Sequence, residues 1–304
     1  MKKTFKIVHL VYNSNAGEGQ QQSKEDLISM IEAAGYKCVY SSSKKKALKT
    51  IDPESEFIII AGGDGTIRKI VMRLLNKKLK HKRPIALFPC GTANNIANSL
   101  GISKNILVNI ASWTDYTLKK FDVGQVLGLP KTRYFLESFG FGLFPRLLKD
   151  LKKKKKDDNQ TPEDEFAMAL GALRALTKSY EGALFKIELD DQIIEEDCIL
   201  VEVMNISSLG PNLNLSNEAD PGDGYLDVII VRAVQRELME HYLEERSEQK
   251  EVVFPIKPLR TRKLTISCKG TDAHIDDELI KDYKMDTLSI SLLDNLLEIV
   301  VKQS

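Results

Sequence analysis

A glycine-rich turn between a buried strand and a helix constrains this chain more than any other feature. The apolar residues 57–61 predict the strand, and the spacing of apolar residues over 67–75 predicts the helix. Between them the turn reads Gly62, Gly63, Asp64, Gly65 and Thr66. Glycines let a phosphate approach the main chain, and the free N–H groups at a helix N-terminus favour an anion. The turn therefore indicates an α/β fold with an anion site, while a plain βα turn with glycines at positive φ is the simpler alternative.

A second turn of the same kind follows a short way downstream. Residues 84–89 are apolar, Gly91 and Thr92 make the turn, and Asn94 precedes another helical stretch. In a parallel α/β sheet both turns would lie at the carboxyl ends of their strands, where such sheets bind ligands. The repeat of the arrangement favours phosphate binding over a plain turn.

Strands and helices alternate along the N-terminal part of the chain. Apolar runs at 5–12 and 36–40 predict two strands before the one at 57–61. A helical stripe over 27–34 lies between the first two. This alternation predicts a parallel, doubly wound, Rossmann-like sheet.

The pattern changes from residue 125 onward. Successive strands are expected at 126–128, 133–142, 183–189 and 198–204, with one helical region at 166–176. Apolar and polar residues alternate over 183–189, as in an antiparallel sheet with one wet face. We expect an α/β plus β fold, with an α/β domain at 1–124 and a β-rich domain at 125–294. The last strand, near 295–304, is expected to return to the first domain.

Better-known phosphate loops are missing from the sequence. No G-x-x-x-x-G-K-[ST] motif occurs, so a Walker-type ATPase is excluded. The Gly-x-Gly patterns at 17–19 and 140–142 lack a third glycine, which makes a dinucleotide-binding Rossmann enzyme a poor fit.

Composition narrows the class of protein further. The formal net charge of +1 argues against a nucleic-acid partner. Four scattered cysteines, with no Cys-x-x-Cys pair, predict reduced thiols in a cytoplasmic protein. Residues 1–4 lead directly into a strand, so no secretory signal is expected, and no apolar run approaches the ~18 residues that span a bilayer. Any membrane contact is therefore expected to be peripheral.

The order and spacing of the two glycine turns resemble the catalytic domain of the diacylglycerol kinase family, in its bacterial lipid-kinase branch. The resemblance extends through further motifs from Asn13 to Glu278. It implies a two-domain kinase, with a nucleotide-binding domain at 1–124, a β-sandwich-like lipid-substrate domain at 125–294 and the active site in the cleft between them. The implied reaction is ATP-dependent, Mg²⁺-assisted phosphorylation of a lipid hydroxyl, most simply that of diacylglycerol to give phosphatidic acid.

The resemblance also implies a set of nucleotide-binding residues. These are Asn13, Gly17, Ser41, Gly62, Gly63, Asp64, Gly65, Thr66, Gly91, Thr92, Asn94 and Asp122. Two positions depart from the family pattern: Ser14 replaces a proline of the first loop, and Arg68-Lys69 replaces a polar residue followed by glutamate. These two cations would either add charge near the phosphates or form a solvated helix face.

Three of these residues have simpler alternatives. Asn13 is equally well explained as an Asx-turn residue, and Asp122 as an ordinary turn aspartate. Ser41, with the two serines that follow it, is also expected to cap a helix running to Ile51.

A polar loop over 205–227 gathers oxygen ligands for a metal. Asp220 and Asp223, with a nearby carbonyl, suit a hard divalent cation such as Mg²⁺. The alternative to a metal site is a pair of ordinary turns, Pro-Gly and Asp-Gly, before a strand. By resemblance the family's Asp-Gly-x-Leu-Asp segment matches 223–227, which implies that Asp220, Asp223 and the Tyr225 carbonyl bind Mg²⁺.

The implied catalytic residues are Glu278, as general base, and Asp64, which would bind Mg²⁺ or order its waters. The family carries Asp-Gly-Glu where this chain has Asp276, Asp277 and Glu278. The extra carboxylate of Asp277 would repel its neighbours or bind another cation. An acidic hairpin turn is the default without the resemblance, and the nearby His274 is by default structural.

Two other functions stay open from the sequence. NAD kinases share the Gly-Gly-Asp-Gly-Thr turn, although residues 89–95 followed by 98–101 favour the lipid branch. A catalytically weak lipid-binding or regulatory protein is the other, because Arg68, Lys69 and Asp277 fall inside motifs that should tolerate little change.

The expected partners are ATP and a membrane lipid at the inner face of the membrane. The acceptor lipid cannot be read from the sequence, and the oligomeric state is open, with a homodimer as one option. The lysine run 152–156 would touch anionic headgroups at about 1 kcal/mol per cation, but a solvated loop is the default.

Overall fold

The computed structural model describes residues 6–13, 22–43, 51–76, 82–153, 161–269, 272–280 and 287–303. The chain divides into two compact units. One contains Met1–Phe121 with Asn295–Ser304, and the other contains Asp122–Asp294. Two long strands, β5 (Tyr116–Leu127) and β17 (Thr287–Lys302), contribute residues to both units.

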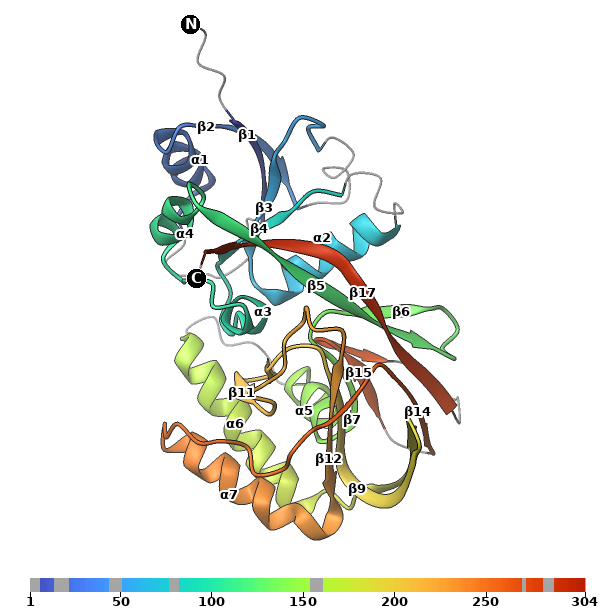
Figure 1. The fold of residues 1–304 in the computed structure, drawn as a ribbon. Helices are drawn as coiled ribbons and strands as arrows, with labels where there is room; N and C mark the ends of the chain where they lie inside the picture. Colours follow the sequence, from blue (N-terminus) through green and yellow to red (C-terminus); the bar gives the residue numbers. More distant parts are fainter. Residues whose placement is uncertain are drawn as a thin grey trace, which may run out of the picture. The chain divides into compact units, whose positions relative to one another are not determined.

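The first unit is a parallel α/β layer (Figure 1). Its strands are β1 (Lys6–Tyr12), β2 (Tyr36–Ser42), β3 (Phe57–Gly62) and β4 (Ile85–Pro89), and its helices are α1 (Lys24–Ala33), α2 (Asp64–Asn76), α3 (Asn95–Ser99) and α4 (Ile106–Ser112). The strands pair in parallel in the order β4-β3-β1-β2, and the end of β17 lies parallel to β4 through Ile299 and Ile85.

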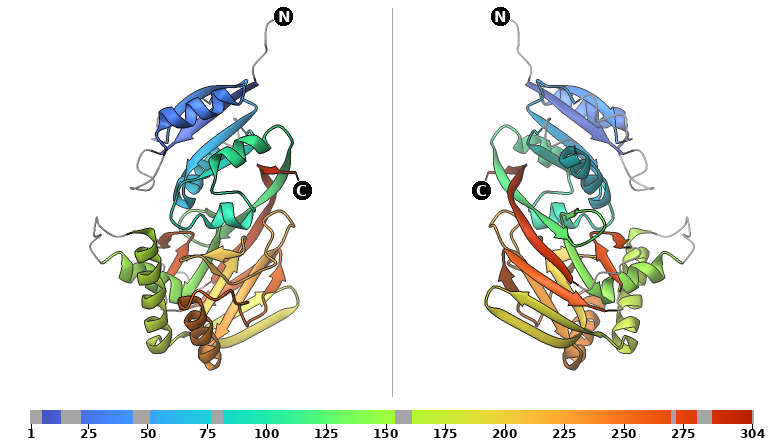
Figure 2. Two further views of the ribbon diagram at one scale, coloured as in Figure 1. Left: turned by 90° about the vertical axis from the view of Figure 1, so that its left-hand side faces the viewer. Right: turned by 90° about the vertical axis from the view of Figure 1, so that its right-hand side faces the viewer.

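Helices cover both faces of this sheet, as the doubly wound prediction requires. Helices α1 and α4 lie on one face and α2 on the other (Figures 1 and 2). Leu27 and Ile31 of α1 share a buried cluster with Ile106 and Ile110 of α4. The predicted parallel, Rossmann-like sheet is therefore confirmed.

The second unit is rich in β-structure and also contains helices. Its strands are β6 (Arg133–Phe135), β7 (Ser138–Gly142), β8 (Ala183–Leu189), β9 (Gln192–Met204), β10 (Ser208–Leu209), β11 (Leu213–Asn214), β12 (Leu226–Arg232), β13 (Leu259–Thr261), β14 (Lys263–Cys268), β15 (Ala273–Ile275) and β16 (Glu278–Ile280). Its helices are α5 (Leu143–Leu151), α6 (Pro162–Ser179), the short 3₁₀ helix η2 (Ala233–Gln235) and α7 (Arg236–Ser247). Every strand pairing seen among its described residues is antiparallel.

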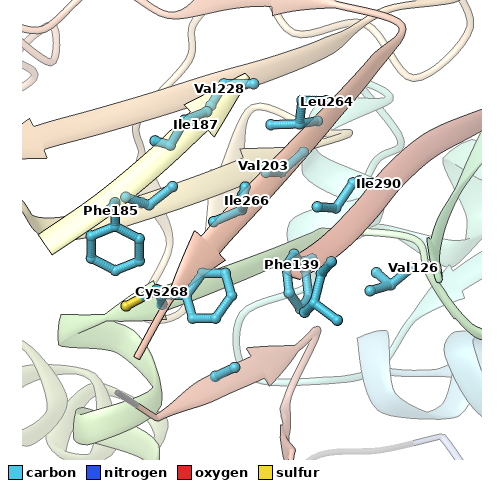
Figure 3. Packing of buried hydrophobic residues seen from close by; sticks show 14 of the residues in the cluster. Val126, Phe139, Phe185, Ile187, Val203, Val228, Leu264, Ile266, Cys268 and Ile290 are labelled. Carbon is cyan, nitrogen blue, oxygen red and sulfur yellow. The ribbon is translucent and has the colours of Figure 1, made fainter. Parts of the chain in front are cut away.

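The sheet of the second unit runs β16-β15-β7-β9-β8-β14-β17 and has two different faces. One face packs an apolar core that includes Phe139, Phe185 and Ile266 (Figure 3). On the other face, α5, α6 and α7 pack against Leu200 and Met204 of β9. The antiparallel β-region expected after residue 125 is confirmed. The 183–189 strand alternates between exposed and buried side chains along much of its length.

Two sequence expectations about element boundaries were wrong. The segment 133–142 is not one strand: it breaks between β6 and β7 because main-chain N–H groups there donate to the carboxylate of Asp276. The strand expected at 36–40 continues to Ser42, because it pairs with β1 through Ser41 and Ser42. Ser41 and Ser42 therefore belong to a strand, and most of the helix that they were expected to cap, at 44–50, lies outside the described residues.

Candidate active site

The two glycine turns pack against each other through their main chains. Strands β3 and β4 are neighbours, and Gly62 at the end of one pairs with Pro89 at the end of the other. A Cβ on Gly63 would lie 2.9 Å from the Cα of Gly91, and a Cβ on Gly91 would lie 2.6 Å from the Cα of Gly63. Only glycine fits at either position, which leaves both turns with main chain facing main chain.

Asp64 joins the second turn to the first. Its carboxylate accepts hydrogen bonds from the main-chain N–H groups of Asn95 at 2.9 Å and Ile96 at 3.0 Å. A carboxylate at the N-terminus of a helix is stabilising because it meets unpaired N–H groups and the positive end of the helix dipole. Asp64 thus fixes the start of α3.

Asn13 and Thr66 connect the end of β1 to the first turn of α2. The side-chain nitrogen of Asn13 donates to Thr66 Oγ1 at 2.8 Å, and the Asn13 N–H donates to the carbonyl of Ala61 at 3.3 Å. Thr66 also fills the space beside Gly62, where a Cβ would lie 2.6 Å from the Thr66 Cβ. Asn13 therefore has a tertiary contact that a simple Asx-turn does not require. Gly17 and Ser14, in the same loop, lie outside the described residues.

Ser41 lies at the carboxyl end of β2 and contacts a buried histidine. His9 Nδ1 accepts from the Asp52 N–H at 3.2 Å, so the neutral ring carries its proton on Nε2. That nitrogen lies 2.8 Å from Ser41 Oγ and donates to it. Burial lowers the pKa of His9, although Asp52 opposes the shift, so the ring stays neutral. The hydroxyl of Ser41 is left as a hydrogen-bond donor.

The other predicted nucleotide-binding residues of this unit either hold a turn in shape or are exposed to solvent. The Asn94 side chain accepts from the Gly91 N–H at 2.8 Å and donates to the Gly91 carbonyl at 2.6 Å, from a left-handed φ of 53°. Asn94 therefore holds the second turn in shape. Gly65 and Thr92 are exposed, as a ligand-facing position requires.

The two cations that follow the first turn have different surroundings. Arg68 is buried within the first unit, with 9% of its surface exposed, whereas Lys69 is exposed. Lys69 therefore fits the alternative of a solvated helix face, and Arg68 does not.

In the second unit, Asp122 is attached to the predicted metal loop. It is fully buried, and its carboxylate accepts from the Gly224 N–H at 2.9 Å. The Asp122 N–H donates to the carbonyl of Pro221. Asp122 therefore supports the loop that carries Asp220 and Asp223, with which the sequence had not grouped it.

The predicted metal ligands come from one tight turn. The Asp223 N–H donates to the Asp220 carbonyl at 3.2 Å. Asp220 Oδ1 accepts from Gly222 N–H, and Asp223 Oδ1 accepts from Tyr225 N–H, both at 2.9 Å. Two carboxylates and a carbonyl are the hard oxygen donors that Mg²⁺ prefers, so the residues fit the ion in chemical type. The described residues hold no cluster of three or more His, Cys, Asp or Glu side chains suited to a metal.

Arg260 already occupies part of this donor set. Its guanidinium forms an ion pair with Asp223 and a second one with the buried Asp227 at 3.3 Å. The same group lies 4.7 Å from the centre of the Tyr225 ring. Burial raises the pKa of Asp227, while Ser216 and Arg260 lower it. A cation entering this loop competes with Arg260 for Asp223.

Glu278 begins β16 directly after a tightly held turn. The Asp276 carboxylate accepts from the N–H groups of Leu136 at 3.1 Å, Glu137 at 2.9 Å and Ser138 at 3.2 Å. Asp276 has a φ of 48°, and its own N–H donates to the Ser138 carbonyl at 2.8 Å. The Glu278 side chain is about half exposed, at 53%, and lies 4.0 Å from Arg133. The turn is held by these hydrogen bonds, and the carboxylate that follows it is partly exposed.

Sequence reasoning missed Asp276 and Arg260. Asp276 was noted only as a member of the acidic turn, whereas it anchors that turn to the β6–β7 break. Arg260 was not considered at all. A lone arginine has no local signal, because its partners lie 37 and 33 positions earlier in the chain, at Asp223 and Asp227.

Family models match both parts of the chain. Residues 7–126 match the model described as diacylglycerol kinase catalytic domain, which includes both glycine turns. Residues 151–285 match the model described as YegS C-terminal NAD kinase beta sandwich-like domain, which includes the loop of Asp220 and Asp223.

Curated relatives and solved structures give the same grouping. A diacylglycerol kinase of Bacillus subtilis (strain 168) is 27% identical over 240 residues, covering 75% of this chain and 74% of the relative. One from Staphylococcus epidermidis is 23% identical over 257 residues, covering 82% and 78%. A crystal structure of a diacylglycerol kinase from Bacillus anthracis strain Sterne superposes with a TM-score of 0.72 at 21% identity and covers 98% of both chains. That likeness establishes the fold alone.

The glycine turns, the antiparallel second unit and the two family matches agree along most of the chain. The chain belongs to the diacylglycerol kinase catalytic-domain family of lipid kinases, with a YegS-type C-terminal domain.

Proposed function

We propose that this protein transfers the γ-phosphate of ATP to a lipid hydroxyl, with diacylglycerol as the simplest acceptor and phosphatidic acid as the product. The observation that carries the proposal is the main-chain contact between Gly63 and Gly91. Two strand–turn–helix units placed side by side concentrate N–H groups and helix N-termini where a polyphosphate would bind.

The first unit would bind the nucleotide. The exposed turn residues Gly65 and Thr92 would contact the phosphates, while Asn94 and Asp64 keep the second turn in shape. Phosphoryl transfer needs mainly positioning and charge neutralisation, so turns fixed in advance reduce the cost of ordering the phosphates in the transition state.

Glu278 would accept the proton of the lipid hydroxyl as its oxygen attacks the γ-phosphorus. A carboxylate with a pKa of ~4.3 is a weak base toward an alcohol, so the proton moves late in the reaction. Asp276 supports this role, because its three main-chain hydrogen bonds fix the turn that precedes Glu278.

Asp220, Asp223 and the Tyr225 carbonyl would hold Mg²⁺. When bound, the ion supplies positive charge that offsets the phosphate charge. Asp122 would keep the loop in shape through Gly224.

The location of the protein follows from its proposed substrates. ATP is a co-substrate of the cytoplasm, and a lipid hydroxyl lies at a membrane surface, so we place the protein at the inner face of the membrane as a peripheral protein. In the described part of the chain, no helix combines the length and the apolar character needed to cross a bilayer.

The test offers labelled ATP with dioleoylglycerol, with a total lipid extract and with NAD, in separate reactions with the whole chain. We expect label in phosphatidic acid, or in another lipid if the acceptor differs. Label in NAD alone would favour the NAD kinase alternative, and no transfer with retained vesicle binding would favour a regulatory protein.

A paired variant tests the base. Glu278→Gln should lower kcat by about 10²–10⁴-fold and spare ATP binding, because it removes the proton acceptor and keeps the shape. Asp277→Asn is the matched control, since it removes a neighbouring charge from the same turn. Full activity in Glu278→Gln would reject the assignment.

A further inference from the structure

One row of three residues crosses the sheet of the second unit beside the catalytic turn. His274 of β15 pairs with Gly140 of β7, and Gly140 pairs with Glu202 of β9. The three residues lie on the same face of the sheet, because directly paired residues point to the same side. The His274 and Glu202 side chains meet across the glycine, with 2.7 Å between Nε2 and Oε1.

The middle position of this row requires glycine. A Cβ on Gly140 would overlap the carboxylate of Glu202. The pair that spans it is completely enclosed, with side-chain exposures of 2% for His274 and 0% for Glu202. The Phe144 ring of α5 lies on the same face of the sheet, with 6.3 Å between its centre and the centre of the imidazole ring.

The surroundings of the imidazole determine where its protons lie. Nδ1 is 2.7 Å from the main-chain carbonyl of Asp276, which can only accept, so Nδ1 must carry a proton. Nε2 is 2.7 Å from a carboxylate oxygen, and two bare lone pairs would repel at that distance. One proton therefore lies between His274 and Glu202, and the pair as a whole is uncharged, as a buried site requires.

We propose that His274 and Glu202 are positioning residues for Glu278: their shared proton fixes the imidazole, and the imidazole holds the Asp276 carbonyl of the turn that presents the base. The inference rests on the proposed lipid-kinase function. It adds a second anchor to that turn, since the Asp276 carboxylate is held by the N–H groups at 136–138 and its carbonyl by His274. Because both the carboxylate and the main-chain carbonyl of Asp276 are held, the two residues that follow have little conformational freedom.

The test compares variants that break the pair with one that keeps its shape. Glu202→Leu removes the partner of the imidazole. Glu202→Gln keeps it, because an amide N–H donates to Nε2 while Nδ1–H still reaches the carbonyl. His241→Gln is the control, since His241 is exposed on α7 and far along the chain from the turn. Each protein is assayed for kcat, for the KM of ATP and for main-chain hydrogen exchange.

We expect Glu202→Leu to lower kcat per folded molecule by about 10–100-fold with the KM of ATP unchanged, because small displacements of a catalytic group are costly. Exchange should be at least about tenfold faster at 136–138 and 276–278 but not in β8. Glu202→Gln and His241→Gln should resemble the wild type. A Glu202→Leu enzyme with normal kcat, or one in which exchange rises equally everywhere, would overturn the proposal.

The two hypotheses fail separately. If the wild type transfers no phosphate to any lipid, the proposed function fails, and exchange still decides whether the pair anchors the turn. Selective loosening at 276–278 in Glu202→Leu, restored in Glu202→Gln, would support the anchor. Unchanged exchange there would overturn it.

Discussion

The side-chain nitrogen of Asn13 lies 2.8 Å from Thr66 Oγ1 and donates a hydrogen bond to it, joining the end of β1 to the first turn of α2. The contact lies beside Gly62, the last residue of β3. The end of β1 thus meets the β3–α2 turn, which lies 53 positions later in the chain, at the carboxyl edge of one parallel sheet. An edge held in this way presents its N–H groups in a fixed arrangement before a nucleotide arrives.

Removing this hydrogen bond should weaken stability and ATP binding together. We expect Asn13→Ala and Thr66→Val each to lower the free energy of unfolding by about 1–2 kcal/mol, because each removes one side of this partly buried hydrogen bond. The double variant should lose less than the sum, with a coupling of about 1 kcal/mol in urea unfolding. If the losses of the two single variants simply added up in the double variant, the hydrogen bond would contribute nothing to the free energy of unfolding.

A methyl group at the second glycine turn should disrupt the phosphate site. In Gly91→Ala the new Cβ would lie 2.6 Å from the Cα of Gly63, so one turn must move. We expect ATP affinity, measured by calorimetry, to fall at least about tenfold, which is 1.4 kcal/mol. Gly171→Ala is the matched control, because that position in α6 has open space and alanine favours helices. Equal ATP affinity in both variants would contradict the assigned site.

The sequence was sufficient for features that local pattern controls. The glycine turns, the parallel sheet and the change to antiparallel strands could all be predicted, because each depends on residues within about ten positions. The break at 136–137 could not, since its cause, Asp276, lies about 140 positions later. His274 looked like an ordinary structural histidine until the strand register placed Gly140 and Glu202 beside it.

The two cysteine thiols of the first unit, Cys38 and Cys90, should be unreactive in the folded protein. Burial raises the pKa of Cys38 and of Cys90 to about 11 each, and neither forms a disulfide. At pH 8 only about 0.1% of such a thiol is ionised, and the thiolate is the reactive form. We expect iodoacetamide to label both residues at least about 100-fold more slowly than in urea. Mass spectrometry of native and unfolded samples measures this, and rapid native labelling would argue against their burial.

Arg260 should compete with Mg²⁺ for Asp223. Removing it in Arg260→Ala takes away a cation that pairs with that carboxylate, so Mg²⁺ should bind about tenfold more tightly. The variant should also be less stable without the ion, because the buried Asp227 carboxylate loses its cationic partner.

The Mg²⁺-induced rise in Tm, titrated for both proteins, measures this competition. Arg262→Ala is the matched control, since Arg262 also lies near the Tyr225 ring but pairs with Asp294. An identical Mg²⁺ response in the Arg260 and Arg262 variants would place the ion elsewhere.

The buried proton between His274 and Glu202 should make stability fall at alkaline pH. Burial lowers the pKa of His274, but the Glu202 charge and hydrogen bond, together with Asp276, raise it above the ordinary 6.5 overall. The folded chain therefore holds the proton more tightly than the unfolded chain does. Its contribution to stability is complete below about pH 6.5 and is lost as the pH rises through the folded-state pKa.

Urea unfolding from pH 6 to pH 9.5 tests that dependence. The wild type should lose more unfolding free energy across this range than Glu202→Gln, in which no proton has to leave the buried pair. His241→Gln should follow the wild type, because it leaves the pair intact and changes only an exposed residue. Parallel curves for the wild type and Glu202→Gln would mean that the proton between His274 and Glu202 does not titrate in this range, and the alkaline loss of stability would then need another group.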